Sequence, residues 1–332
     1  MNEILTQFTH GLKLGRLKSR GLLGFIPVLE SNGGGPEYLT LGEAMEQQTL
    51  SITEVSEGGH VPELKVINRG AKPVLLMDGE ELKGAKQNRV INTTILIPEK
   101  SERVIPVSCT EQGRWHSESR QFQDSGVVMS RQIRAEKNRS VYHSIMEEGT
   151  FRSDQGQVWA SINNLSYEAG VRSRTSAMRD VYREKEGDLD KLVEGFTCAE
   201  GQKGIIAFMH GEVVGLEVIS SPRVFAILFP KILRSYAMEA LTVRGDKRKV
   251  ASAAKARAFM ELLAECKVSQ HPSVGYGEDV RFHANGVDGS ALFYQNTIIH
   301  AAFFAMPVET RPKAGQEMQR NPVPMTDEID ES

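Results

Sequence analysis

Short apolar runs separated by Gly, Pro, Asn and Asp characterise the first part of the chain. Runs of this kind, rich in Val, Ile, Leu and Thr and closed by turn residues, are typical of β-strands. Strands that follow one another through short turns pair antiparallel. Residues 1–125 are therefore predicted to be mostly antiparallel β. The predicted strands are residues 22–29, 50–55, 63–68, 74–77, 89–97 and 103–109.

The pattern changes to helical spacing in the middle of the chain. Residues 127–148, 154–169 and 177–196 carry apolar side chains three and four positions apart, which predicts a helix in each segment. Gly187 is expected to bend or split the third helix, because glycine costs about 1 kcal/mol relative to alanine inside a helix.

The last part of the chain mixes both patterns. Residues 222–241 predict a helix broken at Pro230, because proline lacks the N–H that a helix interior needs. Residues 247–266 predict the clearest helix of the chain. The predicted strands here are residues 204–208 and 212–219, which form a hairpin, and residues 280–284 and 291–305.

These patterns predict an α+β protein with a mostly antiparallel β N-terminal part, a helical middle and a mixed C-terminal part with a second set of strands. Residues 1–125 are expected to form a β-rich region that carries the main motif. Residues 126–308 are expected to pack against it as a helical and mixed region, in one compact unit. Residues 309–332 contain prolines and acidic residues but no large apolar face, and we expect them to be disordered.

Composition and charge narrow the classes of partner. The net charge of -3 gives no global reason to expect a nucleic acid or an anionic membrane as partner. Cys109, Cys198 and Cys266 are odd in number and widely spaced, which fits neither a disulfide framework nor a CxxC zinc pattern. No segment has the apolar length of a signal peptide or a membrane span. We therefore expect a cytoplasmic protein without nucleic-acid or membrane partners.

The densest group of chemically able side chains lies between Gly79 and His116. Its two halves follow predicted strands and are joined by a predicted hairpin, residues 89–97 with residues 103–109. Antiparallel pairing of that hairpin places Asn88 and Arg89 beside Thr110 and Glu111, so that the two halves share one cleft. The candidate residues are Glu80, Glu81, Lys86, Gln87, Asn88, Arg89, Glu111, Arg114 and Trp115.

This mixture of side chains suits acid–base chemistry on an anionic ligand. Neighbouring carboxylates raise one another's pKa, so Glu80, Glu81 and Glu111 are the catalytic candidates. Arg89 and Arg114 offer planar donors for phosphate. A tryptophan beside an arginine can stack on a base or a sugar. The predicted partner is a small, anionic, nucleotide-like molecule.

A structural interpretation of the same residues stands beside this one. Glu, Arg and Gln side chains at strand ends also lock those ends through buried hydrogen bonds, as in a binding or scaffold module. No P-loop, dinucleotide fingerprint, HExxH or GxSxG motif occurs, and the histidines have no zinc-ligand spacing. Magnesium is the cofactor that Glu80, Glu81 or Glu111 would favour, as in a divalent-metal hydrolase, which is the third alternative.

Several motifs, spread from about Leu22 to Leu241, are shared with a known family. They are Val61-Pro62-Glu63-Leu64, Asn68-Arg69-Gly70, Pro73-Val74-Leu75-Leu76, Gly79-Glu80-Glu81-Leu82, Gly84-Ala85-Lys86-Gln87-Asn88-Arg89, Ile105-Pro106-Val107-Ser108-Cys109, Gly113-Arg114-Trp115, Ser153-Asp154-Gln155-Gly156, Val158-Trp159 and Arg234-Ser235-Tyr236-Ala237. In these motifs the chain resembles a bacterial family named for its association with ADP-ribosylglycohydrolase and rhodanese-phosphatase proteins.

The resemblance implies that the protein processes ADP-ribose or a related NAD-derived phosphorylated metabolite. It adds Asp154, Gln155, Trp159 and Arg234 as substrate-binding candidates. With the carboxylates of the main motif, it favours a hydrolase that uses acid–base chemistry. The alternative is a non-catalytic ligand-binding or scaffold protein in which the motif is structural.

Overall fold

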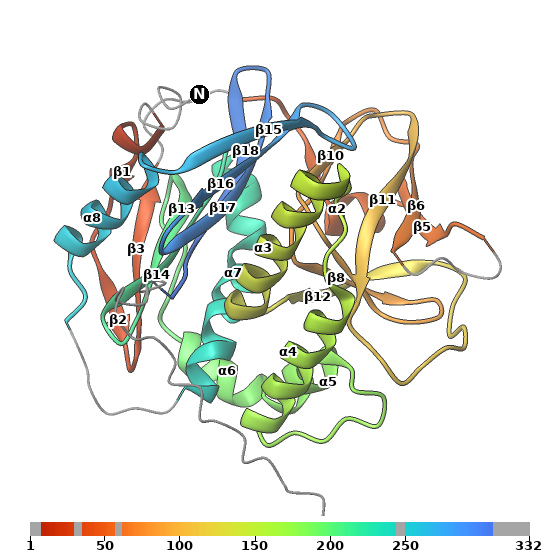
Figure 1. Cartoon of the computed structure of the whole chain (residues 1–332), viewed down its shortest axis with the longest axis horizontal. Helices are drawn as coiled ribbons and strands as arrows, with labels where there is room; N and C mark the ends of the chain where they lie inside the picture. The colour runs from red at the N-terminus through yellow and green to blue at the C-terminus, as the bar shows by residue number, and fades with distance from the viewer. Residues whose placement is uncertain (1–7, 30–34, 57–61, 244–249, 308–332) are drawn as a thin grey trace, which may run out of the picture.

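Antiparallel pairing joins most strands of the molecule, which a computed structural model describes for residues 8–29, 35–56, 62–243 and 250–307 (Figure 1). The largest sheet has nine strands. In spatial order they are β1 (Lys13–Leu14), β3 (Leu23–Leu29), β13 (Gln202–Met209), β14 (Glu212–Ile219), β18 (Thr297–Ala305), β17 (Val287–Tyr294), β16 (Glu278–Ala284) and β15 (Lys267–Pro272), with β2 (Lys18–Arg20) paired to β3. The sheet thus joins strands from both ends of the chain.

Two smaller sheets form the other side of the molecule. The six-stranded sheet consists of β12 (Phe122–Val128), β8 (Glu80–Gly84), β9 (Arg89–Ile91), β11 (Ser101–Cys109), β6 (Glu63–Asn68) and β5 (Leu50–Glu54). The three-stranded sheet consists of β10 (Ile95–Ile97), β7 (Val74–Leu76) and β4 (Leu39–Thr40), of which β4 and β7 are parallel. These two sheets enclose an aliphatic core of their own, which includes Ile52, Val66 and Ile91.

A group of helices separates the two strand regions (Figure 1). They are α3 (Arg131–Glu148), α4 (Gln155–Glu168), α5 (Met178–Glu184), α6 (Glu186–Val193) and α7 (Pro222–Thr242); α2 (Leu41–Glu46) follows β4, and α8 (Ala253–Leu263) packs against the other face of the nine-stranded sheet. The predicted α+β class, with a β-rich first part, a helical middle and a second set of strands, is confirmed. No described helix has both the length and the hydropathy needed to cross a membrane.

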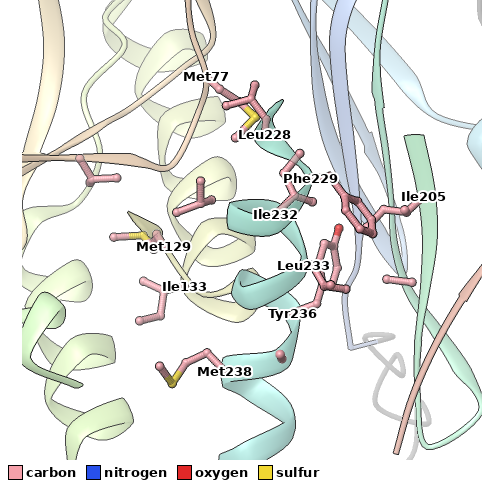
Figure 2. Packing of buried hydrophobic residues seen from close by; sticks show 14 of the residues in the cluster. Met77, Met129, Ile133, Ile205, Leu228, Phe229, Ile232, Leu233, Tyr236 and Met238 are labelled. Carbon is pink, nitrogen blue, oxygen red and sulfur yellow. The ribbon is translucent and has the colours of Figure 1, made fainter. Parts of the chain in front are cut away.

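The helix α7 packs between the nine-stranded sheet and α3 (Figure 2). Its buried side chains include Leu228, Phe229 and Ile232, and they contact residues such as Ile205 of β13. The predicted break at Pro230 is wrong, because α7 continues through it. Proline costs about 3 kcal/mol in a helix interior, but each large apolar side chain buried here contributes about 1.5–3 kcal/mol. Tertiary packing therefore overrides the local preference.

Three other predictions are settled by the element boundaries. The third predicted helix is split into α5 and α6, but the break is at Lys185, and Gly187, where it was predicted, lies inside α6. The helix predicted over residues 247–266 is wrong in extent: Ser252 caps α8, which begins at Ala253. Residues 247–249 and the tail predicted to be disordered lie outside the described residues. The division at residue 125 stays a prediction.

The hairpin predicted over residues 89–97 and 103–109 is confirmed for residues 89–91 but is wrong for residues 95–97. The first strand is interrupted, and β10 leaves the six-stranded sheet to pair with β7. The remaining strand, β9, pairs with the end of β11, with Arg89 opposite Cys109. The Thr110 N–H donates to the Asn88 carbonyl at 3.0 Å. The expected proximity of Asn88 and Arg89 to Thr110 and Glu111 is confirmed.

Candidate functional site

The strand β8 directs two fully buried carboxylates to opposite faces, since successive side chains of a strand alternate. Glu80 accepts a hydrogen bond from the Met77 N–H at 2.9 Å and one from the Lys231 ammonium at 3.0 Å. The same ammonium donates to Asp124 at 2.6 Å. Burial raises the pKa of Glu80, against the opposing charge of Lys231. Lys231 of α7 thereby ties Glu80 to Asp124 of β12.

Glu81 is the less satisfied of the two carboxylates. Its Oε1 accepts a hydrogen bond from the Thr110 hydroxyl at 2.7 Å. Its Oε2 is buried without a hydrogen-bond partner in the part of the chain that the structure describes. Burial raises the pKa of Glu81 to about 7, although Thr110, Ser125 and Arg179 lower it. Glu81 therefore changes its protonation state near neutral pH.

A β-bulge lies opposite Glu81. The register of β8 and β12 shifts between the pairs Leu82–Asp124 and Glu80–Val128, so residues 125–127 have no regular partner. Gly126 has a φ of 77°, a left-handed conformation that glycine adopts without strain. The Arg179 guanidinium donates to the Ser125 carbonyl at 2.7 Å. The bulge is thus held against α5.

The bulge, α5, α6 and α7 surround a cavity of about 220 Å³, called here the cationic pocket. Two helices contribute its four cationic side chains, Arg179 and Arg183 from α5 and Lys231 and Arg234 from α7. Glu81 does not line the pocket, but it lies on β8 opposite the bulge whose residues Ser125, Gly126 and Val127 form part of the lining. The full lining is Ser125, Gly126, Val127, Val128, Arg179, Tyr182, Arg183, Glu186, Leu189, Lys231 and Arg234.

Glu111 belongs to a different group of contacts. The Arg114 guanidinium donates to Glu111 at 2.7 and 2.9 Å, and the Asn88 N–H donates at 3.2 Å. The Thr175 hydroxyl donates to its other oxygen at 2.8 Å. Burial alone would raise the pKa of Glu111, but hydrogen bonds from Arg114 and Thr175 outweigh it and lower the pKa. Glu111 is a charged anchor whose two oxygens are both occupied.

This anchor positions the helix that carries two of the pocket cations. The Met178 N–H, at the start of α5, donates to the Thr110 carbonyl at 2.9 Å. The Gly113 N–H donates to the Thr175 carbonyl at 2.8 Å. Thr110 also bonds to Glu81 through its hydroxyl. The second half of the sequence motif therefore acts on the cationic pocket through the placement of α5.

The remaining candidates of the main motif surround Arg89, which is fully buried. One guanidinium nitrogen of Arg89 donates to Gln87 and to the Cys109 sulfur, each at 2.8 Å. Lys86 and Arg89 lie 5.5 and 5.9 Å from the ring centroid of Trp115, which is half exposed. None of these residues lines the cationic pocket, and neither does Arg114.

The four residues added by the family resemblance are separated in space. Arg234 lines the cationic pocket and pairs with Asp190. Asp154 caps α4, and the Gln155 side chain makes two hydrogen bonds, at 2.7 and 3.0 Å, to the backbone of Cys109. The indole N–H of Trp159 is buried with no acceptor among the described residues. Only Arg234 of these four lines the cationic pocket.

Sequence reasoning missed Arg179, Arg183, Lys231 and the bulge at Ser125. The spacing of these cations is visible in the sequence. Arg179 and Arg183 are four positions apart and Lys231 and Arg234 three apart, so each pair shares a helix face. Such pairs are usually solvated, and nothing in the sequence indicates that two of them meet. As for metals, the described residues contain no group of three or more His, Cys, Asp or Glu side chains placed to hold an ion.

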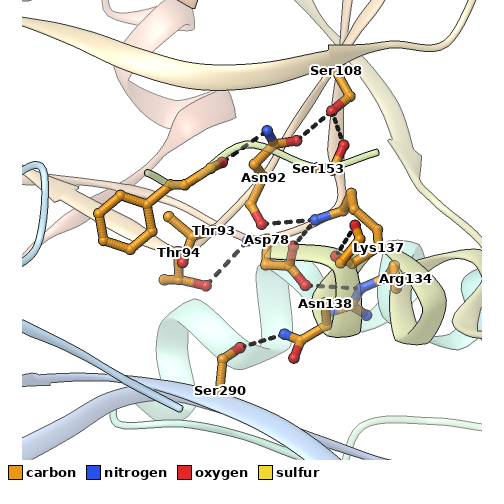
Figure 3. Close-up of polar contacts among 12 residues, drawn as sticks. Asp78, Asn92, Thr93, Thr94, Ser108, Arg134, Lys137, Asn138, Ser153 and Ser290 are labelled. Carbon is orange, nitrogen blue, oxygen red and sulfur yellow. Dashed lines mark hydrogen bonds and ion pairs between the residues drawn. The ribbon is translucent and has the colours of Figure 1, made fainter. Parts of the chain in front are cut away.

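A second polar cluster, the interior ion cluster, consists of Asp78, Arg134, Lys137 and Glu217 and is fully buried (Figure 3 shows the first three). The Lys137 ammonium of α3 donates to Asp78 and to the Asn92 carbonyl. Arg134 lies 3.6 Å from Asp78 and donates to Glu217 at 2.9 and 3.1 Å. The cluster therefore links the β-rich part to the nine-stranded sheet.

The interior ion cluster also explains Gly79 of the motif. Gly79 has a φ of 84°, and a Cβ added there would stand 2.7 Å from the Arg134 side chain. Burial alone would raise the pKa of Glu217, but Arg134 and His300 hold it at about 2. His300 lies between Thr94 and Glu217, in the order of a nucleophile, base and acid. Those three side chains are at most 4% exposed, and they lie at the interior ion cluster and not at the cationic pocket.

The fold and the site thus define an α+β protein with buried carboxylates and a cationic pocket. A comparison of the chain with models of known protein families finds one match. The model described as the ARG and Rhodanese-Phosphatase-superfamily-associated Protein domain, ARPP-1, matches residues 11–304. The match spans most of the chain, so the protein belongs to this family and the resemblance in its motifs is confirmed. No curated protein and no solved structure matches the chain.

Proposed function

We propose that the cationic pocket binds ADP-ribose or a related NAD-derived phosphorylated metabolite and that Glu81 serves in its hydrolysis. One observation carries the proposal: four cationic side chains line a pocket in front of a buried carboxylate whose pKa is raised to about 7. Arginine binds phosphate oxygens in a planar, bidentate way that fits such a ligand. Perturbed carboxylates beside a cavity are common in active sites.

Glu81 suits the role of general base because its pKa lies close to neutral pH. In hydrolysis, its carboxylate takes a proton from the attacking water and returns it to the leaving oxygen. Thr110 fixes one carboxylate oxygen and leaves Oε2 for this proton. Glu80 is already bonded to Lys231 and serves to hold that lysine at the pocket wall. Glu111 positions α5 and takes no part in proton transfer.

The family gives a second, weaker support. Its name records an association with ARG and rhodanese-phosphatase proteins, and association says less than a mechanism does. A non-catalytic binding protein is the second candidate function. It is favoured by the contacts of Glu111, Arg114 and Asn88, which are made within the protein and need no ligand.

The proposal predicts that ADP-ribose binding depends on the exposed arginines of the pocket. Arg183 and Arg234 are 67% and 37% exposed, so replacing both with alanine should leave the fold intact. Each lost charge-assisted hydrogen bond costs about 1.5 kcal/mol or more, roughly tenfold in affinity. Isothermal titration of Arg183→Ala/Arg234→Ala with ADP-ribose should show at least that loss.

The control removes the same charge elsewhere. Arg69 directly follows β6 and Arg103 lies on the neighbouring strand β11, both outside the pocket lining. The variant Arg69→Ala/Arg103→Ala should bind as the wild type does. Equal affinities for both double variants, or no binding of ADP-ribose, its phosphorylated forms or NAD to the wild type, would count against the proposal.

A further inference from the structure

The cationic pocket is too small for a whole nucleotide. Its volume is about 220 Å³, whereas pockets for drug-sized ligands measure roughly 300–1,000 Å³. A ligand of the proposed class must therefore insert one end and leave the rest outside. The question is which end the lining residues select.

The charges of the lining favour a phosphate group with two negative charges. Among the lining residues four are cationic and one, Glu186, is a carboxylate, while the carboxylates that pair with the cations stand outside the lining. Arg179 and Lys231 are held by bonds to Ser125 and to Glu80. A terminal phosphate monoester carries about -1.5 to -2 charges at pH 7 on three strong acceptor oxygens. Such a group can meet donors from both helices at once.

The other two cations are free to turn toward a ligand. Arg183 pairs with Asp180 at 3.0 Å in an exposed position, and Arg234 pairs with Asp190 where both side chains are more than a third exposed. Surface ion pairs contribute only about 0–1 kcal/mol. Arg183 and Arg234 can therefore leave these carboxylates and bind a phosphate at little cost in free energy. The pocket thus combines two cations with fixed positions and two that can move toward a ligand.

The lining offers no platform for a nucleobase. Bases bind proteins by stacking on exposed aromatic rings. The one aromatic lining residue is Tyr182, which is 6% exposed and whose hydroxyl donates to the Val128 carbonyl at 2.8 Å. Trp115 and Trp159 do not line the pocket. The Ser125 hydroxyl and the backbone of Gly126 also line the pocket, and such groups can form hydrogen bonds with a sugar hydroxyl.

We propose that the cationic pocket takes the phosphate monoester of a small sugar, and that any nucleobase of the ligand stays outside. The inference rests on the proposed function and narrows its substrate class to the related NAD-derived metabolites that carry a terminal phosphate, because both phosphates of ADP-ribose itself are internal. Ligands with a terminal phosphate on ribose are then preferred to those whose phosphates are both internal. The sugar phosphate alone is sufficient for binding.

Titration calorimetry of the full chain with ribose 5-phosphate, adenosine, inorganic phosphate and ADP-ribose tests this. We expect ribose 5-phosphate to bind at least tenfold more tightly than adenosine and to compete with ADP-ribose. Arg183→Ala/Arg234→Ala should weaken ribose 5-phosphate binding at least tenfold, and Arg69→Ala/Arg103→Ala should not. Inorganic phosphate should compete for the same site.

The other outcomes separate the two proposals. Binding of ADP-ribose that ribose 5-phosphate does not displace overturns the inference and leaves the proposed function standing. Adenosine binding as tightly as ribose 5-phosphate overturns the inference in the same way. If neither ADP-ribose nor ribose 5-phosphate binds, the proposed function fails together with the inference.

Discussion

Replacing Asp78 with asparagine is expected to lower the free energy of unfolding by roughly 3–5 kcal/mol. The substitution preserves shape but removes the negative charge that faces Lys137 and Arg134, and all three side chains are fully buried. Burial lowers the pKa of Lys137, so the lysine can lose its proton in the variant. Arg134 cannot, because a guanidinium stays protonated in proteins. Urea denaturation at pH 7, followed by circular dichroism, measures the loss.

An exposed ion pair provides the control for Asp78. Glu37 pairs with Lys72 at 2.8 Å, and their side chains are 82% and 52% exposed. Glu37→Gln should therefore leave the free energy of unfolding close to that of the wild type. A similarly small change for Asp78→Asn would mean that the interior ion cluster does not hold the two strand regions together.

Replacing Glu81 with glutamine is expected to abolish most activity while stabilising the protein above neutral pH. A general base contributes roughly 10²–10⁴-fold to a rate, so turnover of the phosphorylated substrate should fall by that factor. The two effects have opposite signs because the raised pKa of Glu81 makes its ionised form unfavourable in the folded protein. A neutral amide removes that cost and keeps an acceptor for the Thr110 hydroxyl.

The pH dependence of this variant follows from the direction of the shift. The folded pKa is about 7 against 4.5 for the unfolded chain, so the native state binds more protons between these values. Stability contributed by the protonated Glu81 is therefore lost as the pH rises from 4.5 to 7, by roughly 3 kcal/mol in total. The melting temperature of Glu81→Gln should exceed that of the wild type at pH 8 and approach it near pH 4.

Glu111→Gln is the matched control, since the pKa of Glu111 is lowered by its partners. Its carboxylate stabilises the fold above its unfolded pKa, so the amide should reduce the melting temperature at pH 8. If Glu81→Gln also destabilises the protein at pH 8, Glu81 is a structural residue and the acid–base role is wrong.

The sequence predicted the parts of the fold that depend on local pattern. Strand and helix periods and the existence of a break between α5 and α6 are set by near neighbours. Pro230 was misread because burial of the surrounding apolar side chains stabilises α7 through the proline. The strand β12 was missed because its polar residues around Ser125 and Gly126 read as a turn, although they form a bulge.

The carboxylates of the candidate site could be predicted from the local sequence, but its cations could not. Glu80 and Glu81 stand out because polar residues follow an apolar strand directly. The cations of α5 and α7 come from segments about 50 residues away from each other and more than 60 residues beyond the end of the motif, and only tertiary folding brings them together. Arg134 and Lys137 look like the solvated face of α3, yet both are buried. Local spacing cannot distinguish a buried ion pair from an exposed one.

The most direct test of the cationic pocket is a crystal structure of the protein grown with ribose 5-phosphate. We predict density for a phosphate between Arg179 and Lys231, within hydrogen-bonding distance of both, with Arg183 or Arg234 turned toward it. Ligand density at another place, such as the groove lined by Arg139 and Arg152 beside the start of α4, with the cationic pocket empty, would contradict the account.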